Sequence, residues 1–274
     1  HVPYLAGNIF YVYEGGKIGD MYVYKNLGVY SYDASNAYNQ QGVKLTPDLS
    51  TLYIDQATGL GKARRYTLNG QEYSGTVYQK KSGDYILRGG DTEWQDTNND
   101  GVIDEKDIVI GGNGVPKYYF GFSNTFRYKQ FSLNLLFNGQ VGNQISNSVA
   151  NGQNTGSSTY SPPTYEMTQN SWWKQGDVAS YPNILKKDDN GNIRNGYNSL
   201  YIEDGTFIRL QSARLAYTFD PKLMNRIKMS SATVFVYGTN LATWTNYSWY
   251  DPEFTSNVLT PGVDGGKYPR RREI

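Results

Sequence analysis

The chain has 274 residues, with 26 Lys and Arg against 25 Asp and Glu, and 15% of its residues are aromatic, among them 26 Tyr. A net charge of +1 provides no concentrated basic surface, so nucleic acid is not an expected partner. No run of about 18 consecutive apolar residues occurs, which excludes a helical membrane protein. The lack of Cys excludes disulfides and thiolate metal sites.

Short stretches rich in Tyr, Val, Thr and Phe are separated by Gly, Asn, Asp and Pro, a pattern that predicts an all-β chain. In chain order, strands are predicted at residues 8–13, 19–24, 75–80, 85–87, 117–128, 131–141, 199–202, 207–219 and 233–243. The first residues show no basic leader, apolar run or small-residue cleavage site, so we expect either a mature chain or a fragment.

Residues 117–143 predict a hairpin with one apolar and one mostly polar face. The apolar face carries Tyr118, Phe120, Phe122, Phe126, Tyr128, Phe131, Leu133, Leu135, Phe137 and Val141. The other face carries Tyr119, Gly121, Ser123, Thr125, Arg127, Ser132, Asn134, Asn138 and Gln140, and Leu136 interrupts this set. Aromatic residues at the strand ends and aliphatic residues in the middle favour a transmembrane barrel over a soluble sandwich, with lipid outside and a polar lumen inside.

The connections between strands alternate in length. Lys129 and Gln130 form a minimal turn and residues 220–230 a compact one, whereas residues 144–197 and 245–266 are long and polar. Outer-membrane barrels have short periplasmic turns and long extracellular loops. We therefore predict a transmembrane antiparallel β-barrel with the two long segments on the extracellular side. Within 207–219 the apolar positions switch from even to odd near Gln211 and Ser212, which predicts a β-bulge.

Several segments together resemble a known family. Residues 89–143, GGDTEWQDTNNDGVIDEKDIVIGGNGVPKYYFGFSNTFRYKQFSLNLLFNGQVGN, are similar to the signature region of the SusC/RagA-like TonB-dependent transporters of Bacteroidota. EGGKIGDMYVYKNLGVY upstream, and YIEDGTFIRLQSARLAYTF and VFVYGTNLATWTNYSWYDPEF downstream, resemble further strands of that family in the same order. The resemblance extends from about Glu14 to Pro269.

The resemblance implies a barrel of roughly 22 strands in the bacterial outer membrane, with an N-terminal plug. It also implies three partners: a SusD-like surface lipoprotein that covers the barrel, the TonB complex that supplies energy, and an oligosaccharide or peptide substrate. We expect residues 1–274 to be a C-terminal segment of such a barrel, surrounded by outer-membrane lipid and lacking the plug and the final strand.

Residues 96–107, DTNNDGVIDEKD, match the calcium-loop pattern. The expected oxygen donors are Asp96, Asn98, Asp100, the Val102 carbonyl, Asp104 and Asp107, with Gly101 at the sharp turn. Asp107 replaces the usual bidentate Glu, which predicts weaker binding. The alternative is a turn in which the same side chains bond backbone amides and hold no ion. If Ca²⁺ is a cofactor of this chain, we expect it here, on the extracellular side.

Aromatic residues gather in and beside the two predicted extracellular segments, namely Trp172, Trp173, Trp244, Tyr247, Trp249 and Tyr250. Aromatic faces stack on sugar rings and on apolar side chains, so one prediction is that they contact the substrate or the lipoprotein. The alternative is packing within the loops, or anchoring at the membrane interface.

Two other classes of protein stay open at this point. A secreted, calcium-stabilised, glycan-binding β-sandwich module also accounts for the aromatic loops and the aspartate-rich turn. A secreted glycoside hydrolase needs two carboxylates a few ångströms apart, but acids such as Glu203 and Asp204 are expected to be solvated instead. His1 is the sole histidine, so catalytic triads and histidine metal sites have no candidates and we expect no enzyme.

Overall fold

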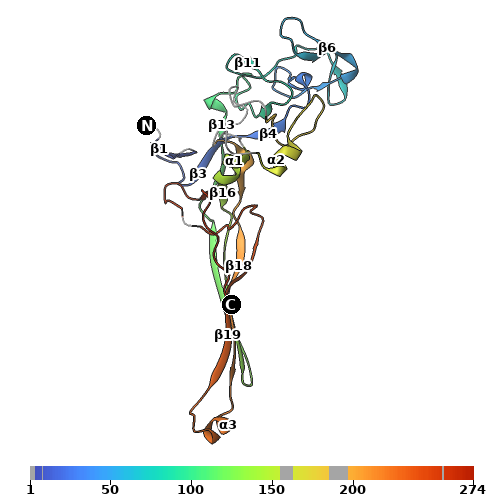
Figure 1. Ribbon diagram of the computed structural model, residues 1–274. Helices are drawn as coiled ribbons and strands as arrows, with labels where there is room; N and C mark the ends of the chain where they lie inside the picture. Colours follow the sequence, from blue (N-terminus) through green and yellow to red (C-terminus); the bar gives the residue numbers. More distant parts are fainter. Residues whose placement is uncertain (1–3, 8, 155–162, 185–196, 255) are drawn as a thin grey trace. The chain divides into compact units, whose positions relative to one another are not determined.

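The computed structural model describes residues 4–7, 9–154, 163–184, 197–254 and 256–274. The chain divides into two compact units (Figure 1). Unit 1 comprises His1–Tyr13, Met21–Gly111 and Ser148–Tyr201, and unit 2 comprises Glu14–Asp20, Gly112–Asn147 and Ile202–Ile274. Residue 8 of the first predicted strand, and residues 155–162 and 185–196 of the long predicted loop, lie outside the described residues.

Unit 1 is built from short strands, turns and two short helices. Its strands are β1 (Tyr4–Gly7), β2 (Phe10–Val12), β3 (Asp20–Tyr24), β4 (Asn26–Val29), β5 (Thr46–Pro47), β6 (Leu52–Ile54), β7 (Gly61–Ala63), β8 (Tyr66–Leu68), β9 (Gln71–Tyr73), β10 (Lys81–Ser82), β11 (Tyr85–Ile86), β12 (Thr92–Trp94) and β13 (Ile108–Asn113), of which β3 and β13 extend into unit 2. They form small sheets in the orders β1-β2-β3-β13, β5-β8-β9, β12-β4, β6-β7 and β10-β11. The helices are α1 (Ser148–Asn154) and α2 (Tyr165–Asn170), with 3-10 turns η1 (Asp33–Ser35), η2 (Leu49–Thr51), η3 (Glu105–Asp107) and η5 (Ser199–Tyr201).

Two apolar clusters form the core of unit 1. One gathers Tyr24, Tyr30, Tyr38, Leu87, Trp94 and Ile103, and the other gathers Ala34, Ala37, Leu45, Ala63 and Tyr66. The rings of Tyr24 and Trp94 meet edge to face with centroids 6.0 Å apart, a geometry that aromatic pairs prefer. The buried hydroxyls of Tyr30 and Tyr38 share a hydrogen bond of 2.8 Å, and Tyr38 donates to Glu93 at 2.9 Å. Unit 1 therefore has a core of its own, in which the buried hydroxyls of Tyr30 and Tyr38 are hydrogen-bonded.

A buried asparagine explains why the predicted strand at residues 75–80 is wrong. Asn36 Nδ2 donates to the carbonyls of Lys80 and Leu87 at 2.8 and 2.6 Å, and Asn36 Oδ1 accepts from the Lys80 amide at 2.9 Å. These side-chain bonds satisfy backbone groups that a neighbouring strand would otherwise satisfy. A single bridge between Tyr78 and Tyr38 is the extent of the pairing of residues 75–80 with the described residues.

Unit 2 contains four long antiparallel strands, coloured from green to red in Figure 1. They are β14 (Tyr118–Tyr128), β15 (Phe131–Val141), β18 (Phe207–Thr218) and β19 (Thr233–Thr245), in the order β14-β15-β18-β19. A second sheet, β17-β16-β20, joins Ile202–Asp204, Gln144–Asn147 and Val263–Asp264. The four long strands lie where the sequence predicts them, to within two residues at each end.

The pairing register of the β14–β15 hairpin confirms the predicted alternation. Phe122 stands opposite Phe137, with ring centroids 6.4 Å apart. Thr125 stands opposite Asn134, and Thr125 Oγ1 donates to Asn134 Oδ1 at 2.8 Å. Apolar side chains therefore share one side of the hairpin and polar side chains the other.

The apolar side continues across β18 and β19. On β15 and β18, Phe131 pairs with Tyr217 and Leu133 with Leu215. On β18 and β19, Leu215 pairs with Val236 and Ile208 with Trp244. The sheet thus presents one continuous apolar face made of all four strands.

The predicted β-bulge lies at Gln211. Phe137 pairs with Leu210 and Leu136 pairs with Ser212, so Gln211 is the extra residue of β18 against β15. The bulge brings Leu210 and Ile208 onto the same face as Leu215, as the switch in the sequence pattern requires. A further irregularity on β19 includes Asn240, whose φ is 51°.

Two segments, residues 199–202 and 220–230, differ in structure from what the sequence predicts. Residues 199–202 were expected to form a strand, but they form the 3-10 turn η5 followed by β17. The compact connection after β18 holds a short helix, α3 (Pro221–Arg226), because Asp220 caps it by accepting from the Lys222 amide at 2.7 Å and Pro221 fits the first turn. In the described part of the chain, no helix has the length and apolar character needed to cross a membrane.

Candidate functional sites

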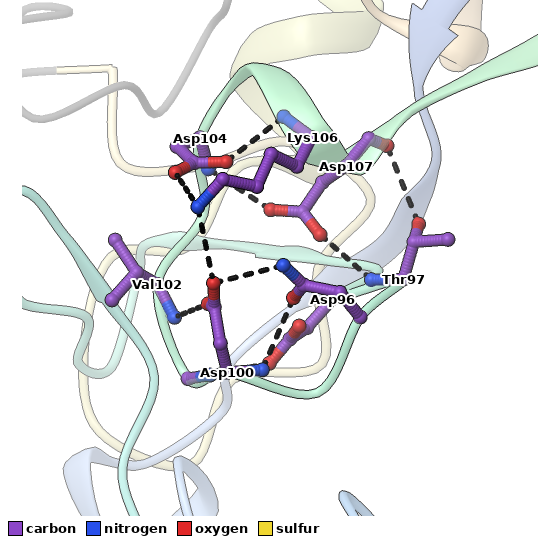
Figure 2. Close-up of polar contacts among 9 residues, drawn as sticks. Asp96, Thr97, Asp100, Val102, Asp104, Lys106 and Asp107 are labelled. Carbon is purple, nitrogen blue, oxygen red and sulfur yellow. Dashed lines mark hydrogen bonds and ion pairs between the residues drawn. The ribbon is translucent and has the colours of Figure 1, made fainter.

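The aspartate-rich loop connects β12 to β13 within unit 1 and is held by its own side chains (Figure 2). Asn98 Oδ1 accepts from the Asp100 amide at 3.1 Å, and Asp100 Oδ1 accepts from the Val102 amide at 2.8 Å. Asp104 Oδ1 accepts from the Lys106 amide at 2.9 Å and so caps η3. These bonds to amides two residues ahead are Asx turns, the local structure that this composition favours.

Two buried aspartates hold the loop from inside. Asp96 Oδ2 accepts from the amide of Gly101 at 3.0 Å, where the chain turns sharply with a φ of 79° at Gly101. Asp107 accepts from the amides of Thr97 and Asp104 at 2.7 and 2.9 Å. Burial raises the pKa of Asp107, the amides of Asp104 and Thr97 lower it, and the charges of Asp96 and Asp104 raise it further.

Lys106 supplies the positive charge beside the loop's carboxylates. Its Nζ lies 3.3 Å from Asp104 Oδ2 and 3.6 Å from Asp100 Oδ2. The carboxylates of Asp104 and Asp100 raise the pKa of Lys106. The Val102 amide, the Asn98 side chain and Lys106 together lower the pKa of Asp100.

The predicted calcium ligands are therefore adjacent but already engaged. The side chains of Asp96, Asn98, Asp100, Asp104 and Asp107 all accept hydrogen bonds from loop amides. Within the described residues, no three His, Cys, Asp or Glu side chains are gathered into a metal site. The hydrogen bonds are those of the alternative turn, so calcium binding stays a prediction.

The two tryptophans in the segment after α2 have different surroundings. Trp172 is buried, its Nε1 donates to the Ser31 carbonyl at 3.0 Å, and its ring fills the space beside Gly90. Trp173 is 46% exposed, and its Nε1 donates to the Thr168 carbonyl at 3.3 Å. Trp172 thus packs within unit 1, whereas Trp173 leaves much of its ring accessible.

The aromatic residues near the end of β19 also separate into different roles. Trp244 belongs to β19, opposite Ile208 on the apolar face, and is 55% exposed. Trp249 and Tyr250 meet edge to face with centroids 5.2 Å apart. Tyr247 is buried and its hydroxyl donates to Asp264 at 2.6 Å. The position of Trp244 on the apolar face suits an anchor at the membrane interface, and Tyr250 keeps an exposed ring.

A buried ion-pair network on the polar face of the sheet was not foreseen from the sequence. The Arg209 side chain is only 2% exposed, pairs with Asp251, and has its Nη1 3.6 Å from Glu253 Oε2. Arg270 Nη2 contacts Glu253 Oε1 at 2.8 Å, which adds a second cation. Because Arg209 stands opposite Asn138 in the sheet, residues 251–253 lie against its polar face. The sequence does contain one signal for this network, since Arg209 places a charge inside a strand predicted to span the membrane.

Glu203 differs from the solvated acid that the sequence predicts. It is half-buried, and its carboxylate accepts from the Ser248 amide and hydroxyl at 2.8 and 2.9 Å. Asn147 Nδ2 donates to the same carboxylate at 2.8 Å. Its acceptor capacity is therefore used to hold the segment after β19 against β16 and β17.

Comparison with known proteins decides the family. No protein-family model matches the chain. The chain is 35% identical over 271 residues to TonB-dependent receptor P39 of Formosa agariphila, a match that covers 97% of this chain and 25% of the relative. The chain belongs to the TonB-dependent receptors. Receptors P26 and P3 of the same organism match at 29% over 246 residues and 28% over 278 residues, covering 83% and 90% of this chain and 24% and 26% of each relative.

Solved structures show the same fold. The RagAB peptide transporter matches with a TM-score of 0.60 and 18% identity, over 98% of this chain and 24% of that chain. The RagAB peptide importer in its closed-closed state matches with a TM-score of 0.59, at the same identity and coverage. These findings confirm the SusC/RagA-like resemblance, the transporter-barrel fold and the outer-membrane location. This TonB-dependent receptor chain spans about a quarter of the length of the relatives it matches.

Proposed function

We propose that this chain forms part of the wall and extracellular face of an outer-membrane importer that takes up oligosaccharides or peptides with TonB-derived energy. The observation that supports this most is the 35% identity to a TonB-dependent receptor over 97% of the chain. The sheet agrees with it, because one apolar face for lipid and one polar face for a lumen are what a transport barrel needs.

The proposal includes a SusD-like surface lipoprotein as partner. Its support is the likeness in fold to the RagAB peptide importer. That likeness is one of fold at 18% identity, so both peptides and oligosaccharides are retained as substrates. We propose no enzymatic activity, since the family is one of receptors and transporters.

Uptake by cells that carry the full-length receptor tests the proposal. Labelled peptide and oligosaccharide mixtures are offered to the wild type, to a strain lacking the receptor and to a strain lacking TonB. Uptake of one mixture should be lost in both deletion strains and return when the receptor gene is restored. Uptake that persists without TonB would contradict energy-coupled import.

A tagged full-length receptor, extracted in mild detergent from its own outer membrane, tests the partner. A surface lipoprotein should co-purify with it in a fixed ratio, and a second tagged TonB-dependent receptor from the same cells serves as control. A receptor that purifies alone, or a lipoprotein that follows both baits equally, argues against a dedicated partner.

A further inference from the structure

The aspartate-rich loop contains one buried carboxylate oxygen with no partner. Asp96 is 8% exposed, and its Oδ1 has no hydrogen-bond partner among the described residues. Its other oxygen accepts from Gly101, which keeps the carboxylate inside the turn (Figure 2). The buried Lys80 ammonium compensates part of the charge of Asp96. A carboxylate oxygen buried without a hydrogen bond is still costly, so this atom points to a cation or another ligand that it can bind.

The loop itself already supplies a cation to its carboxylates. Lys106 Nζ lies within 3.6 Å of carboxylate oxygens of both Asp100 and Asp104. The Lys106 side chain is 68% exposed, so it is free to leave toward solvent. Asp100 and Asp104 thus already attract a cation. The Lys106 ammonium that they bind can be replaced by another cation.

We propose that residues 96–107 form a calcium site in which the ion displaces the Lys106 ammonium from Asp100 and Asp104. Asp96 Oδ1, Asn98 Oδ1, the freed oxygens of Asp100 and Asp104 and the Val102 carbonyl supply the oxygens, in the order that calcium loops use. Asp107 has a supporting role, because both of its oxygens accept from amides of the loop.

Displacement also explains why the carboxylates are not gathered around one point while Lys106 is in place. The ion must compete with Lys106, and a bidentate Glu is lacking at the last position. Both features predict weak binding, with a Kd on the order of 10⁻⁴ to 10⁻³ M, the range of extracellular calcium modules. Binding would order the loop that leads into β13.

Calcium titration of the full-length receptor in detergent tests the site. Hydrogen exchange of the peptide covering residues 96–107 is followed as CaCl₂ is added. Protection should rise with calcium in the wild type and stay flat in Asp100→Asn. In Lys106→Gln the midpoint should fall by about two- to fivefold, since an exposed ion pair of up to roughly 1 kcal/mol no longer competes.

The matched controls come from another aspartate–lysine pair of unit 1. Lys62 and Asp55 form an ion pair on β7 and after β6, away from the aspartate-rich loop in sequence. Lys62→Gln and Asp55→Asn should leave the calcium midpoint of residues 96–107 unchanged. A tighter midpoint in Lys106→Gln cannot come from misfolding.

Equal exchange with and without calcium in the wild type would overturn the site. An unchanged midpoint in Lys106→Gln would overturn the displacement of the lysine. Neither result affects the proposed import function, because uptake is measured in a separate experiment. That proposal is supported by the two-faced strands and by membership of the TonB-dependent receptors.

Discussion

At the scale of single residues, Arg209 is the buried cation of the ion-pair network in unit 2. Its guanidinium is 2% exposed and depends on Asp251 and Glu253 for compensation. Removing one partner of a buried pair costs roughly 3–5 kcal/mol, because the other charge is left buried and unpaired. Arg209→Met should therefore release residues 248–254 from the polar face of the sheet, seen as faster hydrogen exchange there in the full-length receptor.

Arg270→Met is the matched control for that change. Arg270 contacts the same Glu253, but its side chain is 47% exposed, so its loss should cost at most about 1 kcal/mol. Combining Arg209→Met with Asp251→Asn should recover part of the protection, because no lone charge is left at residue 251 and the Asn oxygen still accepts from the Glu253 amide. An equal change in hydrogen exchange for Arg209→Met and Arg270→Met would show that the burial of Arg209 does not determine how strongly it holds residues 248–254.

Arg209 shows why the partners of a buried charge could not be predicted from the sequence. Its charge in a membrane strand was visible, but its partners lie 42 and 44 residues ahead in a connection without regular structure. The aspartate-rich loop was predictable in outline because its bonds reach only two to ten residues along the chain. Lys106 was missed as a partner because a calcium pattern draws attention to oxygen donors alone.

At the scale of elements, the two faces of β15 predict opposite responses to the same substitution. Leu135 stands between Asn124 and Ala213 on the apolar face, whereas Asn134 stands between Thr125 and Arg214 on the polar face. Leu135→Arg should destabilise the barrel by roughly 2–4 kcal/mol, because a charge on the lipid side near the midplane is costly. Asn134→Arg should be mild, as measured by urea unfolding of the full-length receptor in lipid vesicles.

The outcome that contradicts this assignment is an equal loss of stability for the two variants. Spin labels at Leu135 and Asn134 give a second reading, since a lipid-soluble quencher should reach the first far more readily. Both residues occupy the same strand one position apart, so a difference between them reports the face and not the depth.

Element prediction succeeded where local pattern and pairing agree, as in the four long strands. The Gln211 bulge was predictable because the apolar positions of the strand switch from even to odd there. One extra residue in the strand keeps all of them on one face. Element prediction failed at residues 75–80 because the side chain of Asn36, distant in sequence, bonds the amide and the carbonyl of Lys80. It overlooked α3 although Asp220 and Pro221 signal a helix start, because the helix is only six residues long.

At the scale of the whole molecule, the two units differ in what stabilises them. Unit 1 buries aromatic clusters around residues such as Trp94, which is fully buried. The four-stranded sheet of unit 2 instead exposes apolar side chains such as Phe122, Leu215 and Val236, each about half accessible or more. Those side chains need lipid, and the open edge of β14 needs another strand, which the described residues do not provide.

The 274-residue chain expressed by itself should therefore not fold as a soluble monomer. On β19, beyond the pairing with β18, the described residues add a bridge between Thr239 and Glu273, so most of that outer edge is open like the outer edge of β14. Unpaired strand edges template aggregation in water, and each unsatisfied backbone group costs several kcal/mol in hydrocarbon. Sedimentation without detergent should show large aggregates, while the full-length receptor refolded in detergent gives a single species. A monodisperse, cooperatively melting chain in plain buffer would show that its sheet is stabilised without lipid and without further strands, and would favour a soluble sandwich over a barrel wall.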